Sequence, residues 1–211
     1  MSERTQATEA SHAACIGIIM DGNRRWAKEN GLSPYEGHSE GYKKLKEVMG
    51  WARDAGISHV VVYAFSTENW QRSEEEVSYL MKIFRFILGN EIKKITDEHV
   101  RVRFIGDVSR FSDDIRGMME NAEKETSGAH DITLYLAMSY GGRAEILSAV
   151  NTLVTEGRAS IDGARHGSAE PHVTEGDFIQ KLWSHDMPDP DLVIRTGGEK
   201  RLSNFLPWQS V

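Results

Sequence analysis

Short apolar runs alternate along the chain with longer segments in which apolar residues recur at helical spacing. The short runs are rich in Val, Ile and Tyr and are bounded by Gly, Asp or Asn, which is typical of buried strands. They predict strands over residues 15–20, 59–65, 100–105, 132–138 and 192–194. The longer segments predict helices over residues 41–54, 74–95, 112–126 and 143–156, and a short helix over residues 178–183.

This alternation predicts the fold class. Near-continuous apolar strands separated by helices are typical of an α/β protein with a mainly parallel sheet and helices on both faces. Residues 157–190 are rich in Gly, Ser, Pro and His and predict loop plus the short helix. Since no linker divides the chain, we expect a polar, mobile segment over residues 1–12 and a single domain over residues 13–211.

Composition and charge narrow the class of protein further. The chain has 211 residues with 39% hydrophobic residues, which is enough for a substantial core. Its 25 basic and 32 acidic residues give a net charge of −7, which argues against nucleic acid as a partner. The single cysteine, Cys15, excludes an internal disulfide and favours a reducing compartment. With no signal peptide and no membrane-length apolar run, we expect a cytoplasmic protein.

Polar motifs follow the predicted strands. Residues 21–26 follow the first strand, 66–72 the second, 106–107 the third, 139–143 the fourth and 195–204 the fifth. Ligands of open α/β sheets bind outside the carboxyl ends of the strands, which meet at one edge. We therefore expect these motifs to form one polar rim, with the active site at the carboxyl ends of the strands.

Arginines dominate this rim, although the chain as a whole is acidic. They are Arg24, Arg25, Arg72, Arg195 and Arg201. The planar guanidinium fork suits phosphate oxygens, so the rim predicts one or two phosphate-bearing ligands. Asp21, among these cations, would be ionised and could share a Mg²⁺ ion with a diphosphate. Neither a P-loop nor a dinucleotide-binding glycine motif is present, which favours a simpler phosphorylated substrate.

The predicted helix over residues 74–95 is apolar on more than one face. A surface helix normally has a single apolar stripe. Either this helix is buried on two sides, or it packs on the sheet and also lines an apolar cavity. An anion site beside an apolar cavity would suit a lipid diphosphate. Glu76, in the acidic first turn, is a candidate partner for a rim arginine.

Five motifs resemble those of cis-prenyltransferases, also called isoprenyl transferases. They are IMDGNRRWA (residues 19–27), GH (37–38), YAFSTENW (63–70), YGGR (140–143) and DLVIRTGGE (191–199). The resemblance extends over about residues 13–211. It implies repeated condensation of isopentenyl diphosphate onto an allylic diphosphate, usually farnesyl diphosphate, with Mg²⁺ as cofactor. The product would be a long polyprenyl diphosphate such as undecaprenyl diphosphate.

The resemblance also implies roles for individual residues. Asp21 would be the catalytic metal ligand, and Asn69 would be a catalytic residue in a proton relay. The allylic diphosphate would be bound by Gly22, Asn23, Arg24, Arg25 and His38, and Trp26 would either line the substrate site or pack in the core. The substrates would be positioned near the reacting carbons by Ser66, Thr67, Glu68, Trp70 and Arg72. The isopentenyl diphosphate would be bound by Arg195, Arg201, Leu202 and Ser203.

A product tunnel is a further implication of the resemblance. The apolar helix would form one wall, and the small side chain of Ala64 at the entrance would suit long products. Leu134 and Leu136 on the fourth predicted strand would contribute to the floor.

The chain departs from the family pattern at two places. The family often has an arginine four residues before His38, where this chain has Pro34, so one diphosphate contact is either absent or replaced, with Arg24 as the candidate. Beyond Gln209 the family continues to a glutamate that helps to bind Mg²⁺, whereas this sequence stops at Val211. We therefore expect either a domain without its usual C-terminal end or a protein that lacks this ligand.

Two alternatives to a long-chain synthase remain open. One is a non-catalytic partner subunit of a prenyltransferase, and the other is a short-chain isoprenyl diphosphate synthase of the same fold. The resemblance further implies a homodimer and a peripheral contact with the inner face of the membrane during product release.

Overall fold

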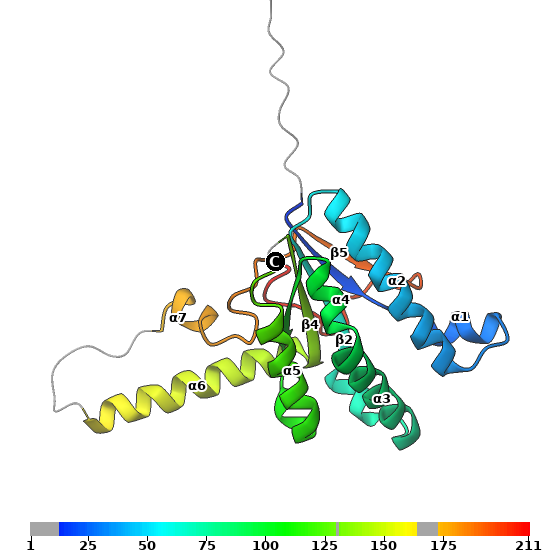
Figure 1. The fold of residues 1–211 in the computed structure, drawn as a ribbon. Helices are drawn as coiled ribbons and strands as arrows, with labels where there is room; N and C mark the ends of the chain where they lie inside the picture. Colours follow the sequence, from blue (N-terminus) through cyan, green and yellow to red (C-terminus); the bar gives the residue numbers. More distant parts are fainter. Residues whose placement is uncertain (1–12, 130, 164–172) are drawn as a thin grey trace, which may run out of the picture.

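The computed structural model describes residues 13–129, 131–163 and 173–211, so the segment predicted to be mobile over residues 1–12 lies outside the described residues. One five-stranded sheet has the order β3-β4-β2-β1-β5, and all of its neighbouring strands are parallel (Figure 1). The strands are β1 (Cys15–Ile19), β2 (His59–Ser66), β3 (Val100–Ile105), β4 (Ile132–Tyr140) and β5 (Leu192–Arg195). The predicted α/β class and all five predicted strands are confirmed.

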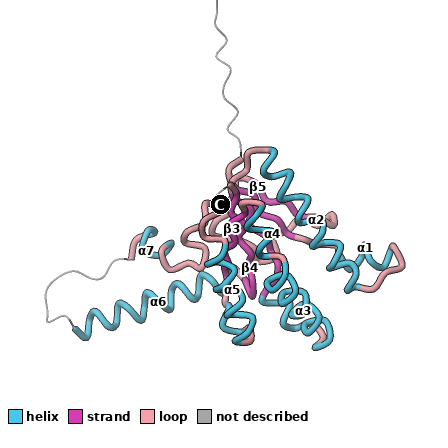
Figure 2. The backbone as a smooth tube through the Cα atoms, viewed as in Figure 1, coloured by secondary structure: helices cyan, strands magenta, loops and turns pink. Residues whose placement is uncertain are grey.

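Helices connect these strands and flank the sheet (Figure 2). They are α1 (Asn23–Glu29), α2 (Pro34–Asp54), α3 (Glu74–Asn90), α4 (Ile92–Asp97), α5 (Asp113–Glu125), α6 (Gly142–Gly163) and α7 (Glu175–Ile179). Two 3₁₀ turns, η1 (Thr67–Gln71) and η2 (Val108–Arg110), follow β2 and β3. The prediction of loop from residue 157 is wrong in part, because α6 continues to Gly163, and the last short helix lies earlier than predicted.

Helix α2 begins seven residues before the predicted start at residue 41. Ser33 caps it, because its side chain accepts from the backbone N–H of Glu36 while the Glu36 carboxylate accepts from the backbone N–H of Ser33. Proline in the first turn and this reciprocal capping box are strong signals for a helix start. His38 therefore lies within the second turn of a helix rather than in a loop.

The predicted helix over residues 74–95 is two helices, which meet at Glu91. The Glu91 side chain is buried and accepts hydrogen bonds from Tyr42 and Lys46 of α2 and from Lys94 of α4. These bonds tie the corner between α3 and α4 to α2. Hydrogen bonds from Lys94 and Lys46 hold the pKa of Glu91 at about 2, so the side chain is ionised.

The core has two sides, one on each face of the sheet. On one face, Leu45 and Met49 of α2 pack on β1 and β2, and an adjoining cluster joins α3, α4 and α5 to Phe65 and Met138. On the other face, the C-terminal residues Phe205 and Leu206 are fully buried against the sheet. Thus most of the helices lie on the first face, and the C-terminal segment fills the second.

A buried polar network holds this C-terminal segment in place. The carboxylate of Glu145, in the first turn of α6, has no exposed surface. It accepts from the hydroxyl of Tyr140 at 2.5 Å, from the backbone N–H of Ser184 at 3.0 Å and from the amide of Gln209 at 3.1 Å. A buried carboxylate needs such partners, so three distant parts of the chain are fixed at the end of β4.

Candidate active site

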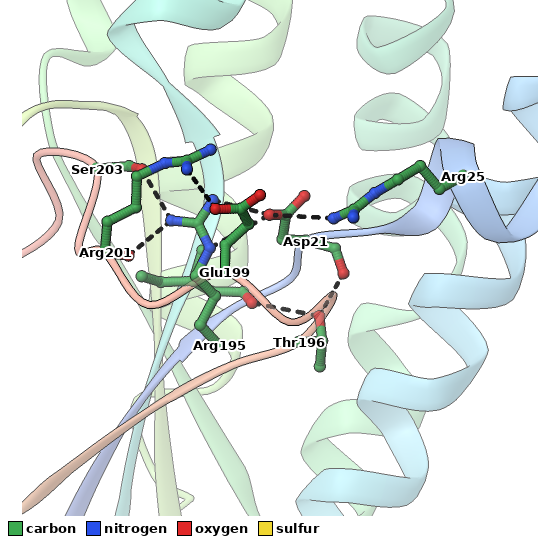
Figure 3. Close-up of polar contacts among 8 residues, drawn as sticks. Asp21, Arg25, Arg195, Thr196, Glu199, Arg201 and Ser203 are labelled. Atoms are coloured by element: carbon green, nitrogen blue, oxygen red, sulfur yellow. Dashed lines mark hydrogen bonds and ion pairs between the residues drawn. The ribbon is translucent and has the colours of Figure 1, made fainter.

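The carboxyl ends of β1 and β5 bring Asp21 and Arg195 together (Figure 3). Ile19 pairs with Arg195 in the sheet, so Asp21 emerges beside the arginine side chain. The guanidinium donates to Asp21 Oδ2 from Nη2 at 2.8 Å and from Nε at 3.2 Å. Arg25 of α1 approaches the same oxygen to 3.6 Å. The sheet register therefore builds an ion cluster from residues that are 174 positions apart.

This cluster keeps Asp21 ionised while leaving it accessible. Partial desolvation acts in the opposite direction, but Arg195, the backbone N–H of Gly22 and Arg25 together hold the pKa of Asp21 below its usual range. The side chain of Asp21 is 28% exposed, whereas that of Arg195 is only 12% exposed. Arg195 and Arg25 both approach the Asp21 side chain at Oδ2. Its other oxygen can therefore take a further ligand.

Arg195 also binds the loop that follows β5. Its Nη1 donates to the backbone oxygen of Arg201 at 2.7 Å and to the hydroxyl of Ser203 at 2.8 Å (Figure 3). Arg201 in turn pairs with Glu199. Leu202 is exposed and lines the same surface hollow as Arg195 and Arg201. The four residues predicted to bind the second diphosphate thus lie together.

A second ion cluster surrounds Glu76 at the start of α3. Its Oε1 accepts from Arg72 at 2.7 Å, its Oε2 accepts from Arg24 of α1 at 3.3 Å, and His38 Nε2 lies 3.7 Å from Oε1. The Glu76 side chain is only 14% exposed. The prediction that Glu76 pairs with a rim arginine is confirmed. One carboxylate therefore holds two arginines predicted to bind or position the allylic substrate and lies close to a third such residue, His38.

His38 is neutral in this setting. Burial lowers its pKa, the positive charges of Arg72 and Arg24 lower it further, and the Glu76 carboxylate acts in the opposite direction. Its Nε2 atom is buried and has no hydrogen-bond partner among the described residues. A buried ring nitrogen without a partner is costly, so this atom is available to a ligand.

The 3₁₀ turn η1 places the residues after β2 at the rim. Asn69 Oδ1 accepts from the backbone N–H of Ser66 at 3.0 Å, which closes the turn. The hydroxyl of Thr67 donates to Glu68 at 3.2 Å, and the amide of Asn204 donates to the same carboxylate at 3.2 Å. Desolvation opposes ionisation of Glu68, but hydrogen bonds from its own backbone N–H, Ser66, Asn204 and Thr67 hold its pKa below the usual range.

An apolar cavity opens beside the Glu76 cluster. Its mouth is polar and includes Asn23, His38, Asn69 and Arg72. Its walls come from β2, β3 and β4 on one side and from α2, α3 and α4 on the other. The apolar lining includes Ala64, Leu80, Ile83, Phe84, Ile87, Leu88, Ile92, Ile95, Val102, Leu134 and Leu136. The predicted positions of Ala64, Leu134 and Leu136 on this cavity are confirmed, and α3 faces both core and cavity.

The structure places two predicted tryptophans away from this cavity. Trp70 packs edge-on against Phe65, with ring centroids 4.8 Å apart, and its indole N–H donates to Ser139 at 3.0 Å. Trp26 is 44% exposed on α1. Neither ring is among the residues that line the cavity.

Two polar residues at the rim had no predicted role. Glu199 pairs with Arg201, and Asn204 bridges three segments. Glu199 lies within the motif quoted above, so its position was a usable signal. No local sequence signal indicates the role of Asn204, because its hydrogen-bond partners are more than 60 positions away in the sequence.

Asp21 fits a Mg²⁺ ion that is shared with a substrate. The described residues contain no cluster of three or more His, Cys, Asp or Glu side chains that could hold a metal alone. Magnesium commonly takes one or two carboxylates and completes its shell with water and substrate phosphates. A single accessible carboxylate beside arginines matches that pattern. Cys15 offers no thiolate ligand, because burial raises its pKa to about 12.

Comparison with known proteins gives the same assignment. Residues 19–211 match the family model described as "Putative undecaprenyl diphosphate synthase". An isoprenyl transferase of Agrobacterium fabrum is 43% identical, over 96% of this chain and 80% of that protein. A farnesyl-diphosphate-specific ditrans,polycis-undecaprenyl-diphosphate synthase of Micrococcus luteus is 40% identical, over 92% of this chain and 76% of that protein.

A solved structure extends the likeness to three dimensions. Lavandulyl diphosphate synthase from Lavandula x intermedia, in complex with dimethylallyl diphosphate, is 32% identical, with a TM-score of 0.85 over 94% of this chain and 83% of that one. The family model, the sequence relatives and this structure all point to one family. The chain therefore belongs to the undecaprenyl diphosphate synthase family of prenyl transferases.

Proposed function

We propose that the chain is a Mg²⁺-dependent cis-prenyltransferase that adds isopentenyl diphosphate repeatedly to an allylic diphosphate, with farnesyl diphosphate as the primer. One observation carries the proposal: an arginine-rich rim opens directly into an apolar cavity. The rim suits diphosphates and the cavity suits an isoprenoid chain. Family membership and the names of the relatives support the same reaction.

The allylic diphosphate binds at the mouth of the cavity in this proposal. Arg24 and Arg72 offer guanidinium groups there, and His38 offers its unpartnered Nε2. Gly22 and Asn23, where α1 begins, and Arg25 complete the site. The isoprenoid tail enters the cavity past Ala64. This orientation places the carbon that bears the diphosphate between the two ion clusters.

The second diphosphate binds at the loop that follows β5. Arg195, Arg201 and Ser203 lie together there and supply two cations and a hydroxyl group. Asn69 lines the mouth of the cavity. Because an amide is a poor base, we assign Asn69 to a proton relay rather than to direct proton removal. Glu68 and Thr67 position the substrates from the same turn.

Departure of the allylic diphosphate is the step that the rim assists. Negative charge grows on this group as its bond to carbon breaks, and preorganised cations stabilise that charge. When bound, Mg²⁺ supplies Lewis-acid stabilisation of the same oxygens. Asp21 would hold the ion through its accessible oxygen, with Arg195 fixing the orientation of the carboxylate.

A direct assay tests this proposal. Purified protein is incubated with labelled isopentenyl diphosphate, farnesyl diphosphate and Mg²⁺, and products are separated by chain length. We expect extended polyprenyl diphosphates, and loss of product when EDTA removes the metal. Absence of any extended product from protein shown to be folded by circular dichroism would overturn the proposal, and so would turnover only in the presence of a second, different subunit.

A short-chain synthase of the same fold is the second candidate. The structural likeness to lavandulyl diphosphate synthase favours it, because that enzyme was solved with a five-carbon allylic diphosphate. The apolar lining of the cavity, which comes from both the sheet and the helices, favours a longer product, such as undecaprenyl diphosphate, here. Supplying dimethylallyl diphosphate as the primer separates the two, since only the short-chain candidate would stop after one condensation.

We further propose a homodimer that uses α6. This helix runs outward from the sheet, on the side opposite α1 and α2 (Figure 1). Leu147, Val150 and Val154 recur along it at helical spacing and are 63%, 41% and 45% exposed. An exposed apolar stripe of this kind favours association with a second copy. Sedimentation equilibrium of the wild type and of Val150→Glu would test it, with a monomeric wild type as the contradicting result.

Location is also part of the proposal. In the described part of the chain, no helix is both long and apolar enough to cross a membrane. We place the protein in the cytoplasm, where a lone cysteine stays reduced, with a peripheral contact at the inner face of the membrane that delivers the apolar product. Flotation with anionic vesicles, with and without product, would test this contact.

A further inference from the structure

The turn that carries Ser203 has a strained backbone. Ser203, Asn204 and Leu206 have φ angles of 49°, 67° and 48°, in the left-handed region. Residues other than glycine rarely adopt this region, and asparagine tolerates it better than most. Three such residues within four positions persist only where the surroundings fix the backbone. Something must therefore hold this turn in place.

Asn204 makes the contacts that do so. Its backbone oxygen accepts from the N–H of Gly142 at 2.8 Å, and its side-chain Oδ1 accepts from the N–H of Arg143 at 2.9 Å. Its Nδ2 donates to Glu68 at 3.2 Å. The side chain thus joins the turn to the end of β4 on one side and to the turn after β2 on the other.

The glycine pair after β4 is shaped for this contact. A Cβ atom on Gly141 would lie 2.7 Å from Nδ2 of Asn204 and 2.6 Å from the hydroxyl of Thr67, and one on Gly142 would overlap Pro207. Because both residues lack a side chain, the C-terminal turn can lie directly against the backbone of Gly141 and Gly142. This accounts for the YGGR motif, which has no other role in the proposed reaction.

The turn carries the groups assigned to the second diphosphate. Arg195 donates to the backbone oxygen of Arg201 and to the hydroxyl of Ser203, so the position of the turn determines where these groups meet. Tyr63 also supports this turn. Its ring stacks on Phe205, with ring centroids 4.7 Å apart, and its hydroxyl donates to the backbone oxygen of Tyr140 at 3.1 Å. Asn204 is the one polar side chain described here that links this turn to Glu68.

We propose that Asn204 is a positioning residue for the isopentenyl diphosphate, and that the glycine pair Gly141–Gly142 is the platform on which it works. Asn204 acts through Ser203 and Arg201 and contacts no reacting atom. Its link to Glu68 couples the second diphosphate site to the turn that holds Asn69. This inference rests on the proposed function and names a residue that determines the binding of one of its two substrates.

Asn204→Gly is the primary test, because glycine keeps the left-handed turn and removes only the amide. We expect the KM for isopentenyl diphosphate to rise about tenfold, while kcat and the KM for the allylic primer stay within about threefold. Calorimetric titration should show the same weakening for isopentenyl diphosphate. Asn90→Gly, at the exposed end of α3, is the matched control and should leave both KM values unchanged.

Two further variants separate the contacts. Asn204→Asp keeps the oxygen that accepts from Arg143 but loses the N–H that donates to Glu68. Adding Glu68→Gln to this variant restores a donor between the two side chains, so part of the lost affinity for isopentenyl diphosphate should return. In Gly141→Ala the added methyl group would lie 2.7 Å from Nδ2 of Asn204. This variant should therefore also raise the KM for isopentenyl diphosphate. These variants decide the question if Asn204→Gly does not fold, as judged by thermal melting.

The outcomes distinguish this inference from the proposed function. A wild type without prenyl transfer overturns the proposed function. A wild type that is active, together with folded Asn204 and Gly141 variants whose KM for isopentenyl diphosphate is unchanged, overturns the positioning role alone. A rise in both KM values together with a lower melting temperature would indicate general loosening and would also contradict it.

Discussion

Two carboxylates at the rim, Asp21 and Glu76, are each surrounded by cations, yet their surroundings differ. Asp21 is paired with Arg195 on one side, is 28% exposed and has an oxygen left for another ligand. Glu76 is 14% exposed and is shared among Arg24, Arg72 and His38. The carboxylate of Asp21 is thus accessible to solvent, whereas that of Glu76 is enclosed by neighbouring side chains.

This difference indicates a division of labour. A carboxylate with a free, accessible oxygen can bind a metal ion, whereas one enclosed by three cationic or titratable groups serves to hold them in position. We therefore expect substitutions at Asp21 to act on the chemical step and substitutions at Glu76 to act on the binding of the allylic substrate.

Asp21→Asn should have the largest effect. The amide cannot supply the negative charge that holds Mg²⁺ on a diphosphate, and loss of one preorganised stabilising group costs about 10²–10³-fold in kcat. Initial rates of isopentenyl incorporation measure this loss. Asp54→Asn, at the exposed end of α2, is the matched control. A variant that retains more than a tenth of the wild-type rate would contradict the metal role.

Glu76→Gln should act mainly on binding. Without the carboxylate, Arg24 and Arg72 lose their shared anchor, so we expect the KM for the allylic primer to rise about tenfold with a smaller change in kcat. Glu75→Gln, one position earlier and exposed, is the control. If kcat fell as far as in Asp21→Asn, the two carboxylates would not have separate roles.

Leu136→Trp sharpens the comparison, because the cavity opens beside Glu76 rather than Asp21. The larger ring fills the cavity, so products should become shorter while the first condensation stays within about threefold of the wild type. Overpacking typically costs about 1–3 kcal/mol of stability, which thermal melting would register. The same substitution at exposed Leu192 is the control, and an unchanged product length would show that the chain grows elsewhere.

His38→Gln should have the smallest effect on rate, because the glutamine amide can still donate a hydrogen bond to the diphosphate, and its clearer effect should be on stability. The pKa of His38 is lowered in the folded state, so below about pH 6.5 the unfolded chain binds a proton that the folded chain does not. The free energy of unfolding therefore falls as the pH drops from 6.5 toward the folded pKa. Between pH 7.5 and 5.5 the wild type should lose about 2 °C more in melting temperature than His38→Gln. An equal loss in both proteins would contradict this assignment, and His185→Gln serves as the control.

The strands and the rim could be predicted because they depend on local sequence. Continuous apolar runs identify strands that are buried on both faces, and the residues that follow parallel strands share an edge by topology. This places Asp21 and Arg195 on the same rim without knowledge of any contact. The start of α2 could also have been predicted, since Ser33, Pro34 and Glu36 form a recognisable capping box.

Other features depend on tertiary contacts and could not be predicted in this way. The break at Glu91 reflects hydrogen bonds to α2, some 45 positions earlier in the chain. Trp70 packs on the core because β2 presents Phe65 to it and β4 presents Ser139, which no local pattern reveals. Asn204 is identified only when the end of β4 and the turn after β2 are seen side by side.

The route of the C-terminal segment has a consequence for the order in which the site comes into being. Asp21 and Arg195 are 174 residues apart. A ribosome that adds roughly 5–20 residues per second makes the carboxylate about 9–35 s before its arginine. Just before Arg195 is made, the nascent chain contains the residues of β1 to β4 and of the cavity-lining helices, but neither Arg195 nor the turn at Asn204. The half of the site assigned to isopentenyl diphosphate is thus the last to form during synthesis.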